Sequence, residues 1–245
     1  MSGTLESYAA SVDALDALVR EAFANCGTSE AATERLRTLR EDKGCWRLCL
    51  MHYGASKSAE TKFWCLQTLA ESLEGLTRRA REAAAAAESS SRGESLSEED
   101  ATALKNAVGV YVTEAVELGN DSAYVKNKLA QVCAQAMALE YPTRWPSFFT
   151  DVVGLLNAGT NGVDMFTRVM EAIDEEIIAT VEAGRSGKGD FTLSMSIKDA
   201  MRADGSVQLI FDAWRQCLTH FARTAPRVAS RIWAVARRYV DWVDI

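Results

Sequence analysis

Residues 124–151 read YVKNKLAQVCAQAMALEYPTRWPSFFTD, and this stretch decides the fold of the chain. Its first part is predicted to be a helix, because apolar residues recur at three- and four-residue steps and form one stripe. The stripe comprises Val125, Leu129, Val132, Cys133 and Ala136. Pro142 cannot continue this helix, since it lacks an amide proton and its ring clashes with the preceding turn. Pro146 suits the first turn of a second helix. Two short helices joined by a proline corner are the unit of a helical solenoid.

The same helical periodicity covers most of the 245 residues, and β-branched runs are scarce. The residues 88–99, ESSSRGESLSEE, predict a flexible surface loop because they are poor in apolar side chains. Asn161-Gly162 and residues 184–190 are predicted to be a turn and a loop. Further helices are predicted over 5–25, 29–41, 43–53, from 58 onward, 97–118, 162–183, 191–203, 205–222 and from 226 to the end.

The predicted fold class is therefore all-α, a HEAT-type solenoid of helical hairpins. Hairpins recur every 35–50 residues or so, which is about the repeat length of HEAT arrays. The repeats share little sequence identity with each other, so an ordinary globular helical bundle is the alternative. The apolar end of the chain, Trp242 to Ile245, indicates either a fully packed last helix or the front piece of a longer solenoid.

Composition narrows the class of protein. No apolar run approaches the roughly 20 residues that a bilayer span needs, and the start MSGTLESYAA lacks the features of a signal peptide. Six cysteines are scattered through helical patterns, and the pair Cys45 and Cys49 has too few neighbouring ligands for zinc. They are expected to be free thiols, as in cytosolic or nuclear proteins. The net charge of −7 restricts any nucleic-acid contact to local basic patches.

Several segments resemble one family of transport receptors. The signature KNKLAQ followed by EYPTRWPSFF, residues 126–149, is similar to nuclear export receptors of the importin-β (karyopherin) superfamily. The segment KFWCLQTL, residues 62–69, resembles an early helix of exportins. Three further segments resemble the exportin-T family of tRNA export receptors: GVDMFTRVM with AIDEE over 162–176, LSMSIKDAMR over 193–202, and YVDWVDI over 239–245. Order and spacing agree from about residue 29 to the last residue.

The resemblance implies that residues 1–245 are the N-terminal, Ran-binding part of a longer receptor. Such a receptor binds Ran-GTP and tRNA cooperatively, releases the tRNA in the cytoplasm after GTP hydrolysis, and shuttles through the nuclear pore. The expected partners are Ran-GTP, tRNA and nuclear pore proteins. The receptor is expected to be a monomer that contacts no membrane and holds no cofactor and no metal. A HEAT-repeat scaffold without Ran dependence is the alternative function.

The resemblance also places Ran against the second helix of each hairpin. These helices are expected at 43–53, 97–118, 145–157 and 192–222. Polar residues on them are the candidates for Ran contact: Lys105, Glu114, Ser147, Asp151, Lys198 and Arg202. A solvated helix face is the alternative role for each of these residues.

A tRNA cargo requires Lys and Arg side chains against its phosphates. Six arginines in two clusters are the candidates: Arg78, Arg79, Arg81, Arg227, Arg231 and Arg238. The last three fall at four- and seven-residue steps, so one helix face can carry all of them. A solvated face is again the alternative.

No catalytic constellation is found, and the chain is not expected to be an enzyme. His52 and His220 both fall inside helical patterns. The glycine-rich stretch 184–189, GRSGKG, lacks the spacing of a phosphate-binding loop and follows a helix rather than a strand. Turnover of GTP by the chain alone would contradict this expectation.

Overall fold

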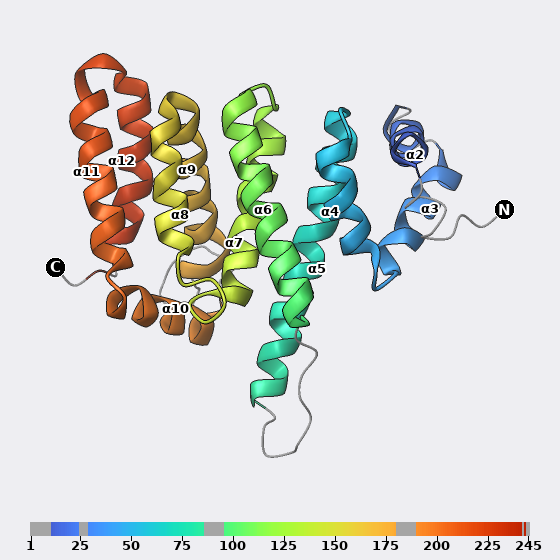
Figure 1. The fold of residues 1–245 in the computed structure, drawn as a ribbon, viewed down its shortest axis with the longest axis horizontal. Helices are drawn as coiled ribbons and strands as arrows, with labels where there is room; N and C mark the ends of the chain where they lie inside the picture. Colours follow the sequence, from blue (N-terminus) through green and yellow to red (C-terminus); the bar gives the residue numbers. More distant parts are fainter. Residues whose placement is uncertain (1–10, 25–28, 86–95, 180–189, 242, 244–245) are drawn as a thin grey trace. The chain divides into compact units, whose positions relative to one another are not determined.

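The computed structural model describes residues 11–24, 29–85, 96–179, 190–241 and 243, and their side chains except those of 24, 80, 81 and 83–85. Every regular element in this part of the chain is helical, and it contains no strand (Figure 1). The helices are α2 (Val12–Ala24), α3 (Glu30–Glu41), α4 (Cys45–Ala55), α5 (Ala59–Ala85), α6 (Glu98–Leu118), α7 (Ala123–Glu140), α8 (Phe148–Gly154), η1 (Leu155–Ala158), α9 (Gly159–Ile173), η2 (Asp174–Ile178), α10 (Phe191–Ala203), α11 (Ser206–Thr224) and α12 (Pro226–Val240). The predicted fold class, all-α with HEAT-type helical hairpins, is confirmed.

The helix boundaries agree closely with the sequence prediction, with a few exceptions. The predicted loop 88–99 and the predicted helix 97–118 overlap, and Glu98 and Glu99 belong to the helix, where they form the first turn of α6. Residues 88–95 of that loop and residues 184–189 of the glycine-rich loop lie outside the described residues, as do Trp242, Asp244 and Ile245.

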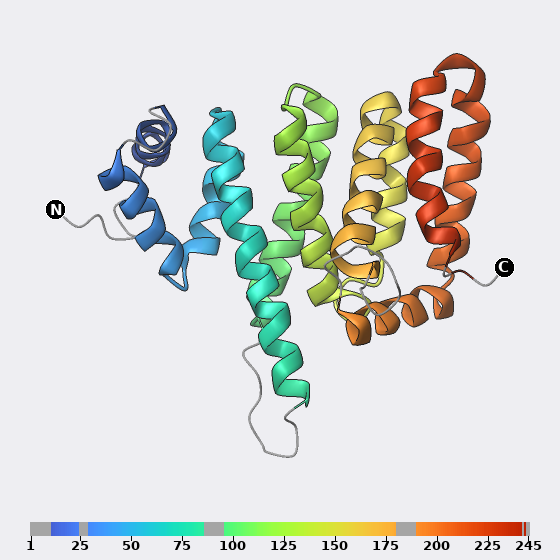
Figure 2. The same cartoon turned by 180° about the vertical axis from the view of Figure 1, so that it is seen from behind.

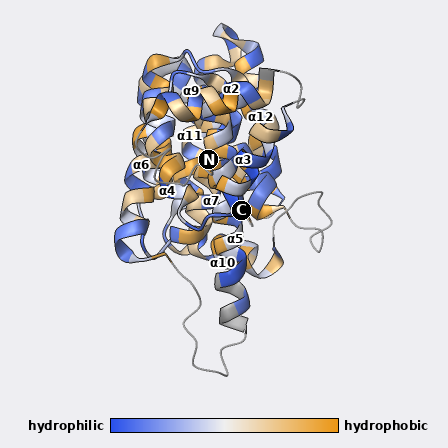
Figure 3. Ribbon diagram, turned by 90° about the vertical axis from the view of Figure 1, so that its right-hand side faces the viewer, coloured by the Kyte–Doolittle hydropathy of each residue, from blue (hydrophilic) through white to orange (hydrophobic). Residues whose placement is uncertain are grey.

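The chain divides into two compact units. The first consists of residues 1–107 and 120–132, and the second of residues 108–119 and 133–245. In the first unit α4 and α5 pack as a helical hairpin, and α2 packs against α3 and α5. Hydrophobic and hydrophilic residues share the same helices in Figure 3, as expected for helices with one buried face.

The interior of the α4–α5 hairpin is apolar and contains three thiols. Leu66 on α5 is fully buried, and so is Trp64, whose ring lies beneath the guanidinium of Arg40 on α3. Cys45, Cys49 and Cys65 are buried free thiols, linked through hydrogen bonds at Cys49. Burial raises the pKa of Cys49 well above its usual range. The predicted free-thiol state therefore holds for the five cysteines that the structure describes.

The second unit contains two hairpins whose helices form two layers (Figures 1 and 2). In the first hairpin η1, which extends α8, packs on α9, and in the second α11 packs on α12. Helix α8 contacts α11 in one layer, and α9 contacts α12 in the other. Helix α10 links the hairpins and packs against η2 and α11.

The expected division into hairpins is wrong for several helices. Residues 43–53, expected as a second helix, form the first helix of the α4–α5 hairpin. The stretch 192–222, expected on the second side of a hairpin, consists of the two predicted helices α10 and α11, and α11 is the first helix of a hairpin with α12. Hairpin partners are selected by which apolar stripes meet, and helical periodicity alone does not specify that choice.

The proline corner begins where the sequence predicts. Helix α7 ends at Glu140, and its last carbonyl accepts hydrogen bonds from the amides of Arg144 and Trp145 at 2.7 and 2.9 Å. Helix α8 begins at Phe148, three residues after the expected start at 145, because the amide of Phe148 bonds back to the carbonyl of Trp145. Pro146 therefore belongs to the turn and not to the helix.

Gly162 lies inside α9, and the turn predicted at Asn161-Gly162 is wrong. A Cβ atom at Gly162 would lie 1.8 Å from the carbonyl oxygen of Leu155, so no larger residue fits where α9 crosses η1. The side-chain amide of Asn161 donates to the carbonyl of Val116 at 3.1 Å, close to the end of α6. A close helix approach, and not a turn, explains this glycine.

Candidate interaction surface on helices α9 and α12

Helix α12 has the sequence PRVASRIWAVARRYV, with four arginines and no carboxylate. Pro226 occupies its first turn, where a missing amide proton costs nothing. Its apolar side is buried, and the ring of Tyr239 lies 5.0 Å from that of Trp214 on α11. The hydroxyl of Tyr239 donates to the carbonyl of Met170 on α9 at 2.6 Å. These contacts fix which side of α12 faces α9.

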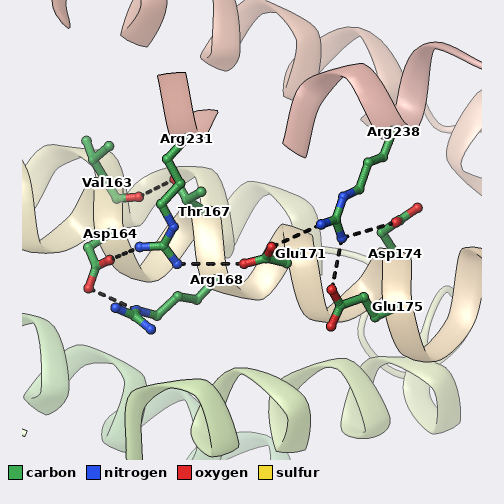
Figure 4. A network of polar contacts seen from close by, with 9 residues as sticks. All are labelled: Val163, Asp164, Thr167, Arg168, Glu171, Asp174, Glu175, Arg231 and Arg238. Carbon is green, nitrogen blue, oxygen red and sulfur yellow. Dashed lines mark hydrogen bonds and ion pairs between the residues drawn. The ribbon is translucent and has the colours of Figure 1, made fainter. Parts of the chain in front are cut away.

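Arg231 and Arg238 of α12 reach acidic side chains of α9 and η2 (Figure 4). The guanidinium of Arg231 lies 2.6 Å from the carboxylate of Asp164 and 3.7 Å from that of Glu171. Arg168 pairs with the other oxygen of Asp164 at 3.0 Å. One arginine of α12 thus bridges two turns of α9.

Arg238 extends the same row of ion pairs. Its guanidinium lies 3.3 Å from Glu171, 2.9 Å from Glu175 and 3.6 Å from the buried carboxylate of Asp174. Glu171 is therefore shared by two arginines. We call these seven residues the charge ladder: Asp164, Arg168, Glu171, Asp174, Glu175, Arg231 and Arg238.

The ladder shifts the pKa values of Asp164 and Arg238. Partial burial favours the neutral form of Asp164, but hydrogen bonds and charges from Arg168 and Arg231 outweigh it, so the pKa of this carboxyl is lowered. Burial likewise disfavours the charged form of Arg238, yet its carboxylate partners raise the pKa of the guanidinium. Both shifts favour the charged forms of Asp164 and Arg238.

The six arginines predicted to bind tRNA have different environments. Arg231 and Arg238 belong to the ladder, while Arg227 in the first turn of α12 is exposed. Arg78 on α5 is 68% exposed and lies 3.9 Å from Glu82. The side chain of Arg81 lies outside the described residues.

Arg79 lines a groove of about 470 Å³ in the first unit. Four cations and four carboxylates line this groove together with Trp46: Arg40, Lys43, Arg47, Arg79, Glu41, Asp42, Glu71 and Asp100. Arg47 forms two hydrogen bonds with Asp100, at 2.9 and 2.6 Å. The balance of charge gives this groove no preference for a phosphate.

The residues predicted to contact Ran lie on three helices. Ser147 and Asp151 come together at the start of α8, where one oxygen of Asp151 accepts hydrogen bonds from Ser147 at 2.9 Å and from the indole of Trp145 at 2.8 Å. Their side chains therefore stabilise the proline corner. This local role is independent of any partner.

The other four Ran candidates differ in exposure. On α6, Lys105 is half-buried and Glu114 is exposed. On α10, Lys198 is only 6% exposed, whereas Arg202 is exposed and pairs with Asp199 at 2.9 Å. Burial leaves Lys198 little surface for a partner protein.

The sequence prediction missed the acidic partners of α12. Asp164 and Glu171 are seven residues apart on α9, as Arg231 and Arg238 are on α12. Matching heptad spacing of opposite charges was the available signal. This matching spacing identifies the ion pairs only once α9 and α12 are known to lie side by side.

The described part of the chain contains no group of three His, Cys, Asp or Glu side chains placed to hold a metal ion. None of its helices combines the length and apolar character needed to cross a membrane. Burial raises the pKa of Cys133 to about 12, which disfavours the reactive thiolate.

Residues 122–245 match the protein family described as Exportin 1-like protein. This match covers half of the chain, from the start of α7 through α12, and the chain belongs to that family. The matched segment includes the proline corner and the whole charge ladder.

The chain is also similar to exportin-T from several organisms. It is 29% identical to exportin-T of Arabidopsis thaliana over 213 residues, which cover 84% of this chain and 20% of the relative. The identity to exportin-T of Oryza sativa subsp. japonica is 27%, covering 96% of this chain and 21% of the relative. The identity to exportin-T of Homo sapiens is 33%, covering 51% of this chain and 13% of the relative. The predicted resemblance to exportin-T is confirmed, and the chain spans about a fifth or less of the length of these relatives.

Proposed function

We propose that the chain is part of a nuclear export receptor that binds Ran-GTP and tRNA cooperatively and releases the tRNA in the cytoplasm after GTP hydrolysis. The observation that carries this proposal is the similarity to exportin-T over 84% of the chain. The receptor shuttles between nucleus and cytoplasm as a monomer, contacts nuclear pore proteins, and performs no covalent chemistry of its own. In this proposal residues 1–245 supply its N-terminal, Ran-binding repeats.

Helical hairpins suit a protein that recognises large partners. Each hairpin exposes one polar helix face, and neighbouring hairpins extend that face without a deep pocket. Cooperative binding requires Ran-GTP and tRNA to favour the same arrangement of hairpins. Whatever factor Ran-GTP adds to tRNA affinity, tRNA then adds to Ran-GTP affinity, because binding linkage is reciprocal.

Exposure ranks the candidates for Ran contact. Glu114 and Arg202 are exposed polar residues in the second unit and remain candidates. Ser147 already donates a hydrogen bond to Asp151 at the proline corner, and Lys198 is buried. We expect substitution of Glu114 or Arg202 to change Ran affinity directly. Substitution of the buried Lys198 is expected to change Ran affinity only if it also unfolds the chain.

The test is binding of the 245-residue chain to Ran loaded with a non-hydrolysable GTP analogue or with GDP, each with and without tRNA. Selective binding of the GTP form, strengthened by tRNA, is expected. Equal binding to both nucleotide forms would contradict Ran sensing and would favour a HEAT-repeat scaffold. GTP hydrolysis by the chain alone would contradict the absence of chemistry.

A further inference from the structure

The exposed surface of α12 carries a tryptophan with one arginine before it and one arginine after it along the helix. Trp233 is 58% exposed, the second-highest value among the exposed large hydrophobic residues of the described chain. Arg227, Ser230 and Arg237 are exposed with it. Successive positions are three or four residues apart and therefore adjacent, so they form one strip that winds around the helix and begins at Arg227, near the side that carries Arg231 and Arg238. At 1.5 Å per residue, residues 227 and 237 are roughly 15 Å apart along the axis.

This strip differs from the ladder in its charge. Arg227 and Arg237 form no ion pair with any of the described residues, whereas Arg231 and Arg238 of the same helix are paired with carboxylates. Arg223, in the last turn of α11, adds a further exposed cation beside the start of α12. The strip is thus a local concentration of positive charge in a chain of net charge −7.

We propose that this strip of α12, formed by Arg227, Ser230, Trp233 and Arg237, binds a single-stranded segment of RNA. Guanidinium groups without a protein counter-charge suit phosphates, and an exposed indole between them suits an unstacked base. The proposal rests on the proposed function, in which RNA is the cargo, and assigns the cargo contact to this strip. It moves that contact away from Arg231 and Arg238, which the ladder already neutralises.

Charge separates RNA from the other occupants of an exposed helix face. A further helical hairpin or a second copy of the chain would cover Trp233 and the half-exposed Val240. Either would also bury Arg227 and Arg237, which costs free energy unless the covering surface supplies carboxylates. RNA supplies a negative charge at every phosphate and leaves the arginines partly hydrated.

The test is fluorescence anisotropy of a labelled 12-nucleotide polyuridine RNA, and of an RNA duplex of the same length, titrated with the 245-residue chain at several salt concentrations. Trp233→Ala is expected to weaken single-strand binding by between about 5-fold and 150-fold, as for loss of one base–aromatic stack. Trp233→Phe is expected to retain most of the affinity because its ring still stacks. Duplex binding should respond little, since its bases are already stacked.

Charge is tested separately. The double variant Arg227→Gln, Arg237→Gln is expected to flatten the plot of log affinity against log salt by about 1.4, or 0.7 for each phosphate contact to a single strand. Arg215→Gln is the matched control, because Arg215 is an exposed arginine on α11 that pairs with Asp212. It should leave the affinity within about twofold, as expected for a residue without an RNA contact.

Three results would overturn the proposal. They are no RNA binding by the unsubstituted chain, equal losses for the control and strip variants, and self-association that Trp233→Ala abolishes in analytical ultracentrifugation. Ran-GTP binding by the same variants separates this proposal from the proposed function. Normal Ran selectivity without RNA binding would reject the strip alone, and RNA binding without Ran selectivity would reject the Ran mechanism alone.

Discussion

The α4–α5 contact of the first unit and the α9–α12 contact of the second are built from different side chains. The first lies within one hairpin and buries apolar residues and thiols, among them Cys49 on α4 and Cys65 on α5. The second joins two hairpins and adds a ladder of partly exposed ion pairs to its apolar contacts. Apolar burial depends little on salt or pH, while exposed ion pairs are screened by salt. The stability of the hairpin interior should therefore change little with salt or pH, whereas the stability of the contact between hairpins should change with both.

The largest effect is expected from truncating a buried aromatic side chain of the first unit. Trp64→Ala should lower the free energy of unfolding by roughly 3–5 kcal/mol, because it removes a fully buried aromatic side chain and leaves a cavity. Denaturant unfolding followed by circular dichroism measures this loss. Trp233→Ala is the matched control on an exposed tryptophan and should change stability by less than about 0.5 kcal/mol. Similar losses for the two variants would contradict the burial of Trp64.

Tyr239→Phe probes the neutral part of the α9–α12 contact. It removes a buried hydroxyl that donates to the carbonyl of Met170 and keeps the ring against Trp214. A loss of about 1–2 kcal/mol is expected, since the carbonyl loses a buried hydrogen bond. The loss should be the same at low and high salt in denaturant unfolding. A loss that disappears in salt would assign this contact to electrostatics instead.

Glu171→Gln probes the charged part of the same contact. The substitution removes the one carboxylate shared by Arg231 and Arg238 and keeps its shape. We expect a loss of about 0.5–1 kcal/mol at low salt, a small value because these groups are about one-third exposed. Thermal unfolding in 0.05 M and 1 M salt should show this loss shrinking as the Debye length falls from over 10 Å to about 3 Å. Glu74→Gln, at an exposed glutamate of α5 outside the ladder, is the control for the same change in net charge.

The smallest effect is the pH dependence of the ladder. Because the pKa of Asp164 is lowered in the folded state, its ionised form stabilises the fold above the unfolded value of about 3.9. That contribution is lost as pH falls from about 4 through the lowered folded pKa. Asp164→Asn should therefore reduce stability by a few tenths of a kcal/mol at pH 6 and by less at pH 2.5. Equal losses at both pH values would show that the charge of Asp164 is not responsible.

Most helices could be predicted because their signals are local. The end of α7 follows from Pro142, whose missing amide proton acts within one turn of the chain. The start of α8 could not be placed as well, since it depends on how the turn closes: the amides of Arg144 and Trp145 bond back to Glu140, and the amide of Phe148 bonds back to Trp145. Gly162 was misread as a turn because the carbonyl of Leu155, which excludes a Cβ there, approaches only in the folded chain.

The candidate site was less predictable than the fold. Spacing placed Arg227, Arg231 and Arg238 on one helix and could not say which of them would be neutralised. That outcome depends on the acidic stripe of α9, which is brought alongside α12 by burial of Tyr239 and its neighbours. The paired Arg231 and Arg238 and the exposed Arg237 are all arginines of α12, so neither residue type nor helix distinguishes them in the sequence.

The sequence by itself determined the helical fold, its proline corner and the resemblance to exportin-T. These follow from apolar periodicity, proline chemistry and ordered motifs, all of which act or are read over a few residues. Only the tertiary structure decided the hairpin partners, the place for Gly162 and the availability of each arginine of α12. Those properties depend on which faces meet across tens of residues of chain, because ion pairing and desolvation act through space.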